Sequence, residues 1–286
     1  MTKKQAIPAD FGFGEDEGLL RDMARKMLDE RLPTERLRSL VASDPEPVYE
    51  QGQRAPWDEQ LWSEIVELGW TGLAIPESEG GTDFSMVGIA ALVEEVGRSA
   101  LPSPLIPTLA TSMVLREVNG GKANALMQRI AAGATGSLAI TNEQGSWDPK
   151  DAPLTAHDEN DEMILNGVAY FVQDAFKADF LLATAKMNDW VVLCRVERDA
   201  AGLNVEHDHI HDLTRDQATV CFDNVRVWLD GIICLNTLPA LERAWPRLLA
   251  LIAADLCGAS EWLLQTTCEY AGQRVQFDRP IGFFQA

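Results

Sequence analysis

The chain has 286 residues, and its 24 Lys and Arg against 44 Asp and Glu give a formal net charge of −20. This acidity argues against a nucleic-acid partner or an anionic membrane surface, because both select clustered Lys and Arg. A chain of this length and a hydrophobic content of 46% predicts two or three packed globular units. Five cysteines without a C-x-x-C pair favour reduced thiols and a cytoplasmic location. We expect no secretory signal, and no apolar run approaches the roughly 20 residues of a membrane span.

The first part of the sequence has helical periodicity. Apolar residues recur at helical spacing from about residue 15 to 132, which predicts an N-terminal all-α domain over 1–135. Near Gly136 the pattern changes to short apolar runs separated by turn formers such as 158–161 and Asn166-Gly167. This spacing predicts a β-barrel or sandwich domain over 136–236.

Helical spacing returns near Pro246, which suits the first turn of a helix. We therefore expect 237–286 to be the first, incomplete part of a C-terminal helical bundle, which makes the fold class α+β multidomain. A new apolar element begins close to the last residue, and ordered chain ends are usually tied down. The sequence therefore suggests C-terminal truncation.

The order of helices, β-barrel and helices resembles that of the FAD-dependent acyl-CoA dehydrogenases. Residues 68–77 with Gly80-Gly81 resemble the family's N-terminal signature, and 138–141 and 171–175 are similar to its two flavin-facing strands. Residues 222–227 resemble the close of the β-domain, and 270–285 the tetramer-contact segment. The resemblance rests on these motifs occurring in the same order and at similar spacing.

The resemblance implies FAD as cofactor and α,β-dehydrogenation of an acyl-CoA thioester. A carboxylate would remove the α-proton while the β-hydride passes to the flavin. Electrons would then pass to an electron-transfer flavoprotein, in a homo- or heterotetramer serving fatty acid or steroid catabolism.

The resemblance also assigns residues of the first flavin strand and the loop after it. Thr141 would hydrogen-bond the isoalloxazine edge, with backbone contacts from Leu138 and Ile140; the alternative for Thr141 is a strand-end residue that caps a turn. Gly145 and Ser146 are the nearest equivalents of the family's Glu-Pro-Gly-x-Gly-Ser-Asp loop, which touches flavin and substrate.

On the second flavin strand the family often has Trp and Thr, where this chain has Phe171 and Gln173. Phe171 would cover one flavin face and Gln173 would hydrogen-bond it with a different reach. The alternative is that both are ordinary strand residues.

Near the end of the chain, Arg274, Phe277 and Gln285 match positions that reach the flavin of a neighbouring subunit. An Arg suits the pyrophosphate because its guanidinium binds phosphate oxygens bidentately. The alternative is a solvated Arg at a helix C-terminus. Asp278 replaces a family Gly and puts a negative charge near the phosphate.

No catalytic base is assigned. In most of the family it would lie beyond Ala286, and the alternative position, counted back from Tyr270, falls at Leu248, which cannot act as a base. The nearby carboxylates Glu242, Asp255 and Glu261 are expected to be solvated or helix-terminal charges.

The stretch His207-Asp-His-Ile-His211 places three His on one side if it is extended, which could ligate zinc or nickel. We favour a solvated polar strand and expect no metal site.

A second reading of the sequence is a non-catalytic or half-site partner subunit of a heteromeric acyl-CoA dehydrogenase of the steroid side-chain type. The altered loop at 145–147, Gln173 and Asp278 are features that fit a degraded half-site.

Overall fold

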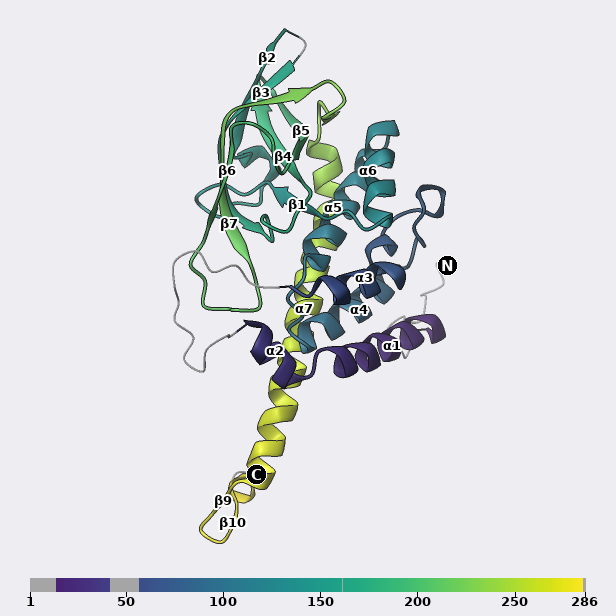
Figure 1. Cartoon of the computed structure of the whole chain (residues 1–286), viewed down its shortest axis with the longest axis vertical. Helices are drawn as coiled ribbons and strands as arrows, with labels where there is room; N and C mark the ends of the chain where they lie inside the picture. Colours follow the sequence, from purple (N-terminus) through teal and green to yellow (C-terminus); the bar gives the residue numbers. More distant parts are fainter. Residues whose placement is uncertain (1–13, 42–56, 161, 285–286) are drawn as a thin grey trace, which may run out of the picture. The chain divides into compact units, whose positions relative to one another are not determined.

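Helices form the described N-terminal part of the chain, as the spacing of its apolar residues predicts (Figure 1). The computed structural model describes residues 14–41, 57–160 and 162–284. The helices are α1 Glu15–Arg31, α2 Thr34–Val41, α3 Glu59–Glu67, α4 Met86–Arg98, α5 Leu105–Val118, α6 Gly121–Ala131 and α7 Leu238–Gln273.

Between α6 and α7 in sequence, eight strands form one sheet in the order β6-β7-β3-β2-β4-β5-β8, with β1 added beside β4. Most neighbours are antiparallel, and β1 and β2 run parallel to β4. The strands are β1 Gly136–Ala139, β2 Leu154–Glu159, β3 Glu162–Gln173, β4 Phe180–Met187, β5 Trp190–Glu197, β6 Leu203–His207, β7 Gln217–Trp228 and β8 Ile232–Cys234. The predicted α+β architecture with a central β-domain is therefore confirmed.

The burial of each strand explains its sequence pattern. The first six residues of β4 are all buried, so this strand reads as one continuous apolar run. Strand β7 instead alternates between buried and more exposed residues over much of its length. Phe222 of β7 packs in the sheet core with Leu181 of β4 and Val192 of β5.

Asn166-Gly167 is not a turn between two strands, so that prediction is wrong. Both residues lie inside β3, where the pairing with β7 shifts register between Leu165 and Gly167. Gly167 has φ +135°, and a Cβ there would lie 2.9 Å from the carbonyl oxygen of Pro153. The glycine allows a β-bulge and a close approach to the backbone at Pro153. An Asn-Gly pair is also typical of a turn, so the sequence pattern predicts one here.

Pro246 does not begin a helix either, because α7 starts at Leu238 and carries Pro246 in its interior. A proline removes one helical hydrogen bond, a cost that buried flanking residues can offset. Leu241, Ala244 and Leu248 around it are buried. Tertiary packing therefore continues the helix through a residue that usually marks a helix start.

The first part of α7 is held to α5 by charge. Glu117 accepts hydrogen bonds from Arg243 Nε at 2.8 Å and from Arg247. Burial opposes ionisation of Glu117, but the bonds from Arg247 and Arg243 lower the pKa of its carboxyl overall.

Among the described residues, α7 is long and apolar enough to cross a membrane by length and composition. No apolar run of this length is expected from the sequence. Leu241, Leu248 and Leu251 of α7 are buried in the fold, whereas 22% of its most apolar 18-residue stretch is buried, and a single helix of this kind is weak evidence for a membrane span.

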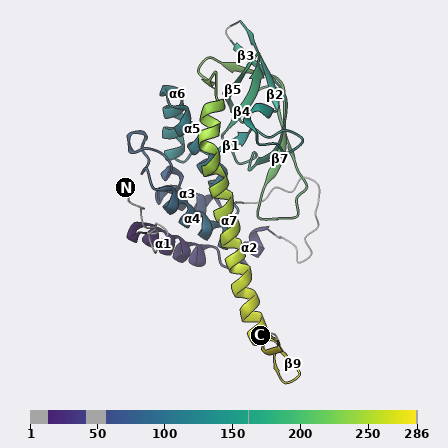
Figure 2. The same cartoon turned by 180° about the vertical axis from the view of Figure 1, so that it is seen from behind.

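The chain forms two compact units, and α7 contributes to both (Figure 2). The first consists of Met1–Leu37, Val87–Leu101 and Ala250–Ala286, and the second of Arg38–Met86 and Pro102–Leu249. Within the first unit α4 and α7 cross at two glycines. A Cβ on Gly258 would lie 1.7 Å from the carbonyl oxygen of Glu94, and one on Gly97 would lie 2.0 Å from that of Asp255.

Candidate functional site

The end of β1 lies beside the end of β3, so the two predicted flavin segments come together in the second unit. The Tyr170 amide donates to the carbonyl oxygen of Thr141 at 2.9 Å, and Ser137 Oγ donates to the carbonyl oxygen of Gln173 at 2.5 Å. Thr141 and Ile140 are buried. Leu138 is half-buried, and Gln173 is exposed.

Phe171 occupies a strained backbone position at this end of β3. Its φ is +58°, and the register with β7 shifts between Ala169 and Val172. A bulky residue at positive φ is an outlier that the surrounding structure must impose. Its ring is 45% exposed. It lies toward Gly145, where a Cβ would be 3.8 Å from Phe171 Cε2. The loop after β1 therefore meets the bulge.

Ser146 is committed to contacts within its own loop. Its amide donates to Asn142 Oδ1 at 3.0 Å, as does the amide of Gln144 at 3.1 Å, which forms an Asx-type turn. Its hydroxyl donates to Asp151 Oδ2 at 2.6 Å and accepts from the Asp148 amide at 3.2 Å. The hydroxyl would have to leave Asp151 to donate a hydrogen bond to a ligand.

The next residue, Trp147, packs edge-to-face on Trp245 of α7, with ring centroids 5.0 Å apart. Leu248, one turn further along α7, is apolar and buried. Glu242 is exposed. In the first unit, Glu261 lies 3.6 Å from Arg25. These placements single out no carboxylate as a general base.

The predicted residues near the chain end belong to the first unit. The Arg274 guanidinium donates to the Tyr270 hydroxyl at 2.5 Å and lies 5.7 Å from the centre of its ring. Phe277 is 86% exposed, between β9 Val275–Gln276 and β10 Arg279–Pro280. Gln285 lies outside the described residues.

A buried charged cluster lies directly after β3 and includes none of the predicted site residues. Lys177 Nζ lies 2.7 Å from Asp174 Oδ1 and 3.9 Å from Asp216 Oδ2, and His207 Nδ1 lies 3.2 Å from Asp216 Oδ1. Burial raises the pKa of Asp174 to about 6, although the Lys177 ammonium opposes the shift. The Asp174 and Lys177 pair, three residues apart, is a pattern typical of a solvated turn. The sequence pattern therefore does not predict that these two side chains are buried.

The polar stretch that begins at His207 is partly inside this cluster. The His207 ring stacks on Phe176 with centroids 3.8 Å apart, and Asp208 accepts from Gln217 and Thr219 at 2.9 and 2.8 Å. Within the described ranges, no group of three or more His, Cys, Asp or Glu is placed to hold a metal ion.

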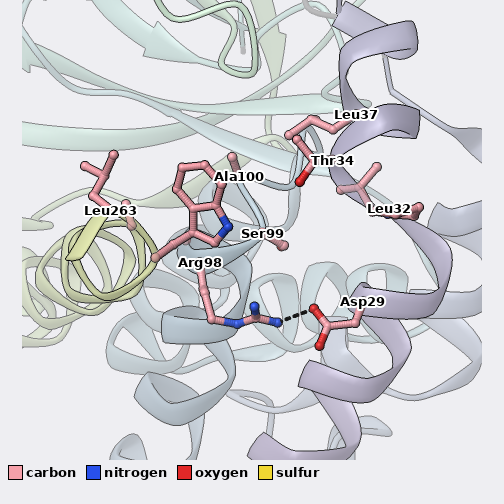
Figure 3. Close-up of a pocket in the computed structure, with 12 residues that line it drawn as sticks. Asp29, Leu32, Thr34, Leu37, Arg98, Ser99, Ala100 and Leu263 are labelled. Carbon is pink, nitrogen blue, oxygen red and sulfur yellow. Dashed lines mark hydrogen bonds and ion pairs between the residues drawn. The ribbon is translucent and has the colours of Figure 1, made fainter. Parts of the chain in front are cut away.

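The first unit contains a pocket of about 470 Å³ (Figure 3). Apolar side chains such as Leu32, Leu37 and Trp262 line it, and Arg98 pairs with Asp29 at its edge at 2.6 Å. It holds none of the predicted site residues.

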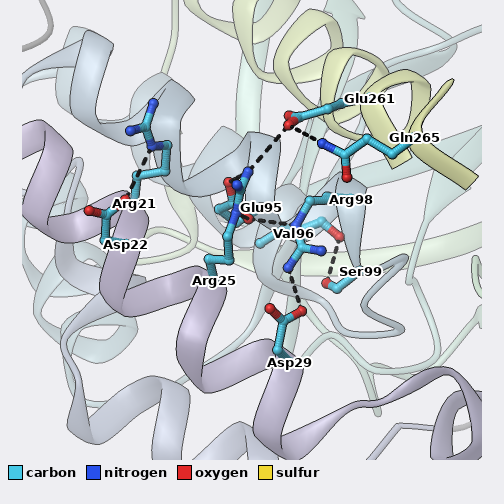
Figure 4. A network of polar contacts seen from close by, with 10 residues as sticks. All are labelled: Arg21, Asp22, Arg25, Asp29, Glu95, Val96, Arg98, Ser99, Glu261 and Gln265. Carbon is cyan, nitrogen blue, oxygen red and sulfur yellow. Dashed lines mark hydrogen bonds and ion pairs between the residues drawn. The ribbon is translucent and has the colours of Figure 1, made fainter. Parts of the chain in front are cut away.

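Beside this pocket, the buried carboxylate of Glu95 accepts from Arg25 at 2.7 and 2.9 Å and from Arg98 at 2.8 Å (Figure 4). The hydrogen bond to Glu95 raises the pKa of the Arg25 guanidinium above its ordinary value. The carboxylate is fully paired, so this network ties α1 to α4.

Comparison with known proteins agrees with this architecture. Residues 14–133 match the family model for the acyl-CoA dehydrogenase N-terminal domain. The chain is similar to acyl-CoA dehydrogenase IpdE2 of Mycobacterium tuberculosis, at 28% identity over 277 residues that cover 95% of this chain and 69% of the relative.

Two solved structures have the same fold over nearly the whole chain. A variant of the Tcur3481–Tcur3483 steroid acyl-CoA dehydrogenase has a TM-score of 0.81 and 27% identity over 95% of this chain and 71% of its own. A glutaryl-CoA dehydrogenase from Mycobacterium smegmatis in complex with FADH2 has a TM-score of 0.83 and 21% identity, covering 98% of this chain and 71% of its own.

Residues 14–133 therefore match the N-terminal domain of the acyl-CoA dehydrogenase family, and nearly the whole chain shares the fold of acyl-CoA dehydrogenases. The chain spans about 70% of the length of these relatives.

Proposed function

We propose that this chain supplies the flavin-facing part of an FAD-dependent acyl-CoA dehydrogenase, which oxidises an acyl-CoA thioester and passes electrons to an electron-transfer flavoprotein. The observation that carries the proposal is the meeting of the β1 end, the 142–148 loop and the β3 bulge. The N-terminal domain would span 1–135, the β-domain 136–236 and the beginning of the helical bundle 237–286.

The side chains around the bulge fit one face and edge of an isoalloxazine ring. Phe171 offers an exposed aromatic ring next to Gly145, which has no side chain to block a flat ligand. Thr141 would hydrogen-bond the flavin edge, and the exposed amide of Gln173 would bond a second polar atom. Leu138 and Ile140 would add backbone contacts. The chemistry that FAD supplies is acceptance of a hydride from the thioester's β-carbon.

Other residues would bind the ends of the two ligands. Gly145 and Ser146 would line the path of the acyl-CoA, with Ser146 also reaching the flavin. Arg274 would bind the pyrophosphate of a flavin held by a neighbouring subunit of a homo- or heterotetramer, with Phe277 and Gln285 beside the adenosine part. The general base is not assigned to any residue of this chain.

A second candidate function is that of a partner subunit with an incomplete half-site in a heteromeric acyl-CoA dehydrogenase acting in steroid catabolism. Two observations favour it: the Ser146 hydroxyl is already bonded to Asp151, and Leu248 puts a buried apolar side chain at the alternative base position. Similarity to the Tcur3481–Tcur3483 steroid enzyme supports the same reading.

The test is FAD uptake by the purified chain, followed by absorbance changes on adding linear, aromatic and steroidal acyl-CoAs. Bound FAD that bleaches with one thioester supports the dehydrogenase. Bound FAD that no thioester bleaches favours the half-site subunit, and a chain that takes up no added FAD contradicts the flavin site.

Paired variants locate the flavin site. Thr141→Val should weaken FAD binding roughly 3- to 10-fold, the value of one lost hydrogen bond. Thr155→Val, on exposed strand β2, is the matched control and should leave the Kd unchanged. Equal Kd values for both variants would remove Thr141 from the flavin site.

Arg274→Ala should weaken FAD retention in the assembled protein more strongly, because a charged bond to phosphate would be lost. Arg279→Ala in the same hairpin is its control. Unchanged retention in Arg274→Ala would remove that role.

A further inference from the structure

Two residues at the end of β3 have a positive φ, which is rare for Phe and occasional for Asp. Phe171 has φ +58° and Asp174 has φ +47°, and both lie in the left-handed region usually taken by glycine. Such positions persist where the surrounding structure imposes them, and they are common at functional sites. The contacts that hold residues 171–174 are therefore informative.

Hydrogen bonds to the main chain fix this segment on both sides. The Asp174 amide donates to the carbonyl oxygen of Asp216 at 2.9 Å, which ties the segment to the chain just before β7. On the other side, Ser137 Oγ donates to the carbonyl oxygen of Gln173 at 2.5 Å.

Buried charged side chains contact the same segment. The Lys177 and Asp174 side chains are only 5% and 8% exposed, with Nζ and Oδ1 2.7 Å apart. Asp216 is 2% exposed; its Oδ2 lies 3.9 Å from Lys177 Nζ, and its Oδ1 lies 3.2 Å from His207 Nδ1. Arg198 lies over the Phe176 ring, 5.3 Å from its centre, and Phe176 stacks on His207. The cluster thus joins the turn after β3, the end of β6 and the start of β7.

Buried charges of this kind add little stability over an apolar core, because desolvation offsets most of the attraction. Their directional contacts can still select one backbone arrangement. Each of the charged groups Asp174, Lys177 and Asp216 is within three residues of the strained segment or bonded to it. By contrast, the ion pair of Arg226 with Glu162 at 2.6 Å, between β7 and β3, has a guanidinium side chain that is 51% exposed.

We propose that Asp174 and Lys177 are positioning residues, which hold the bulge at 171–174 so that Phe171 and Gln173 face the flavin. The flavin part of this proposal rests on the proposed function. The backbone part does not, because it concerns the chain without ligand.

The test compares Lys177→Met with Arg226→Met, which breaks an ion pair between strands β3 and β7 outside the cluster. Native-state hydrogen exchange is measured without ligand on peptides that contain the amides of Tyr170 and Asp174, and the Kd for FAD is measured in parallel. Lys177→Met should speed exchange at these amides at least tenfold and weaken FAD binding at least tenfold. Arg226→Met should change both less than twofold.

Each outcome decides one part of the proposal. Wild-type exchange in Lys177→Met overturns it, because the ion pair would then not hold the bulge. Faster exchange with an unchanged FAD Kd overturns only the link to the flavin. A wild-type chain that takes up no FAD contradicts the proposed function, while the exchange result still decides the backbone part. If Lys177→Met does not fold, the isosteric Asp174→Asn is judged by the same criteria, and Lys177→Arg should restore slow exchange.

Discussion

The crossing of α4 and α7 in the first unit makes Gly258→Ala a sharp test of the helix packing. The added Cβ would lie 1.7 Å from the carbonyl oxygen of Glu94 and 2.8 Å from the amide nitrogen of Arg98. Both atoms belong to the backbone, so no rotamer change can relieve the clash. Since carbon and oxygen need about 3.2 Å, the two helices would have to move apart by about 1.5 Å.

The cost follows from two opposing terms. Forcing extra volume into a packed contact costs about 1–3 kcal/mol or more, and a clash with rigid backbone belongs at the upper end of that range. Replacing Gly by Ala in a helix returns about 1 kcal/mol. The net loss is therefore about 2 kcal/mol, or a fall in Tm of roughly 4–8 °C.

Gly272→Ala on the same helix is the matched control, because its Cβ would meet nothing within 4 Å. It should stabilise the chain slightly, by about 0.5 kcal/mol near the helix end. Thermal and urea unfolding followed by circular dichroism measure both variants. Equal stability of Gly258→Ala and Gly272→Ala would refute the close crossing.

Three further outcomes are expected. The pKa of Asp174 is about 6 in the fold against an ordinary 3.8, so its contribution to stability is present below about pH 4 and lost as the pH rises through 6. The free energy of unfolding of the wild type relative to Asp174→Asn should fall by about 2 kcal/mol from pH 4 to 7, and a flat difference in urea titrations would contradict the burial. Ala100 lies just after α4 at φ +50°, so Ala100→Gly should raise the free energy of unfolding by about 1 kcal/mol in urea; a lower free energy of unfolding would show that the contacts of its methyl group outweigh the strain. Phe171→Gly should raise the free energy of unfolding by about 1 kcal/mol and weaken FAD binding. A lower free energy of unfolding would mean that the packing contacts of the ring outweigh the backbone strain.

The fold class could be predicted from the sequence because local patterns and tertiary packing agree over most of the chain. Apolar residues at helical spacing in 86–96 became α4, and the continuous apolar run at 180–184 became the buried strand β4. The family resemblance did not require this agreement between local patterns and packing, because it rests on the order of the motifs.

The two wrong predictions have the same physical origin. Gly167 and Pro246 are strong local signals for a turn and a helix start, yet both lie inside long elements. Pairing with β7 and β2 carries the strand through Gly167, and buried neighbours carry the helix through Pro246. Long-range contacts of this kind leave no mark within a few residues of the sequence.

The candidate site was predictable only in part. The resemblance selected Thr141 and Phe171, and the structure places their segments side by side. His207 and Asp216, which complete the buried cluster around Asp174 and Lys177, lie more than thirty positions beyond Asp174 along the chain. Their proximity depends on how β6 and β7 return to β3, so no local spacing rule could have found it.

The two bulges of β3 differ in a way that bears on function. At Gly167 the chain uses the residue that takes a positive φ without strain, and the bulge there serves only the close approach to Pro153. At 171–174 it keeps Phe and Asp at positive φ, although glycine would take the same path at lower cost. A requirement for backbone shape alone would have been met by glycine in both places. The strain at the second bulge therefore indicates a requirement for the side chains themselves: an exposed ring beside Gly145 and a buried carboxylate that anchors it.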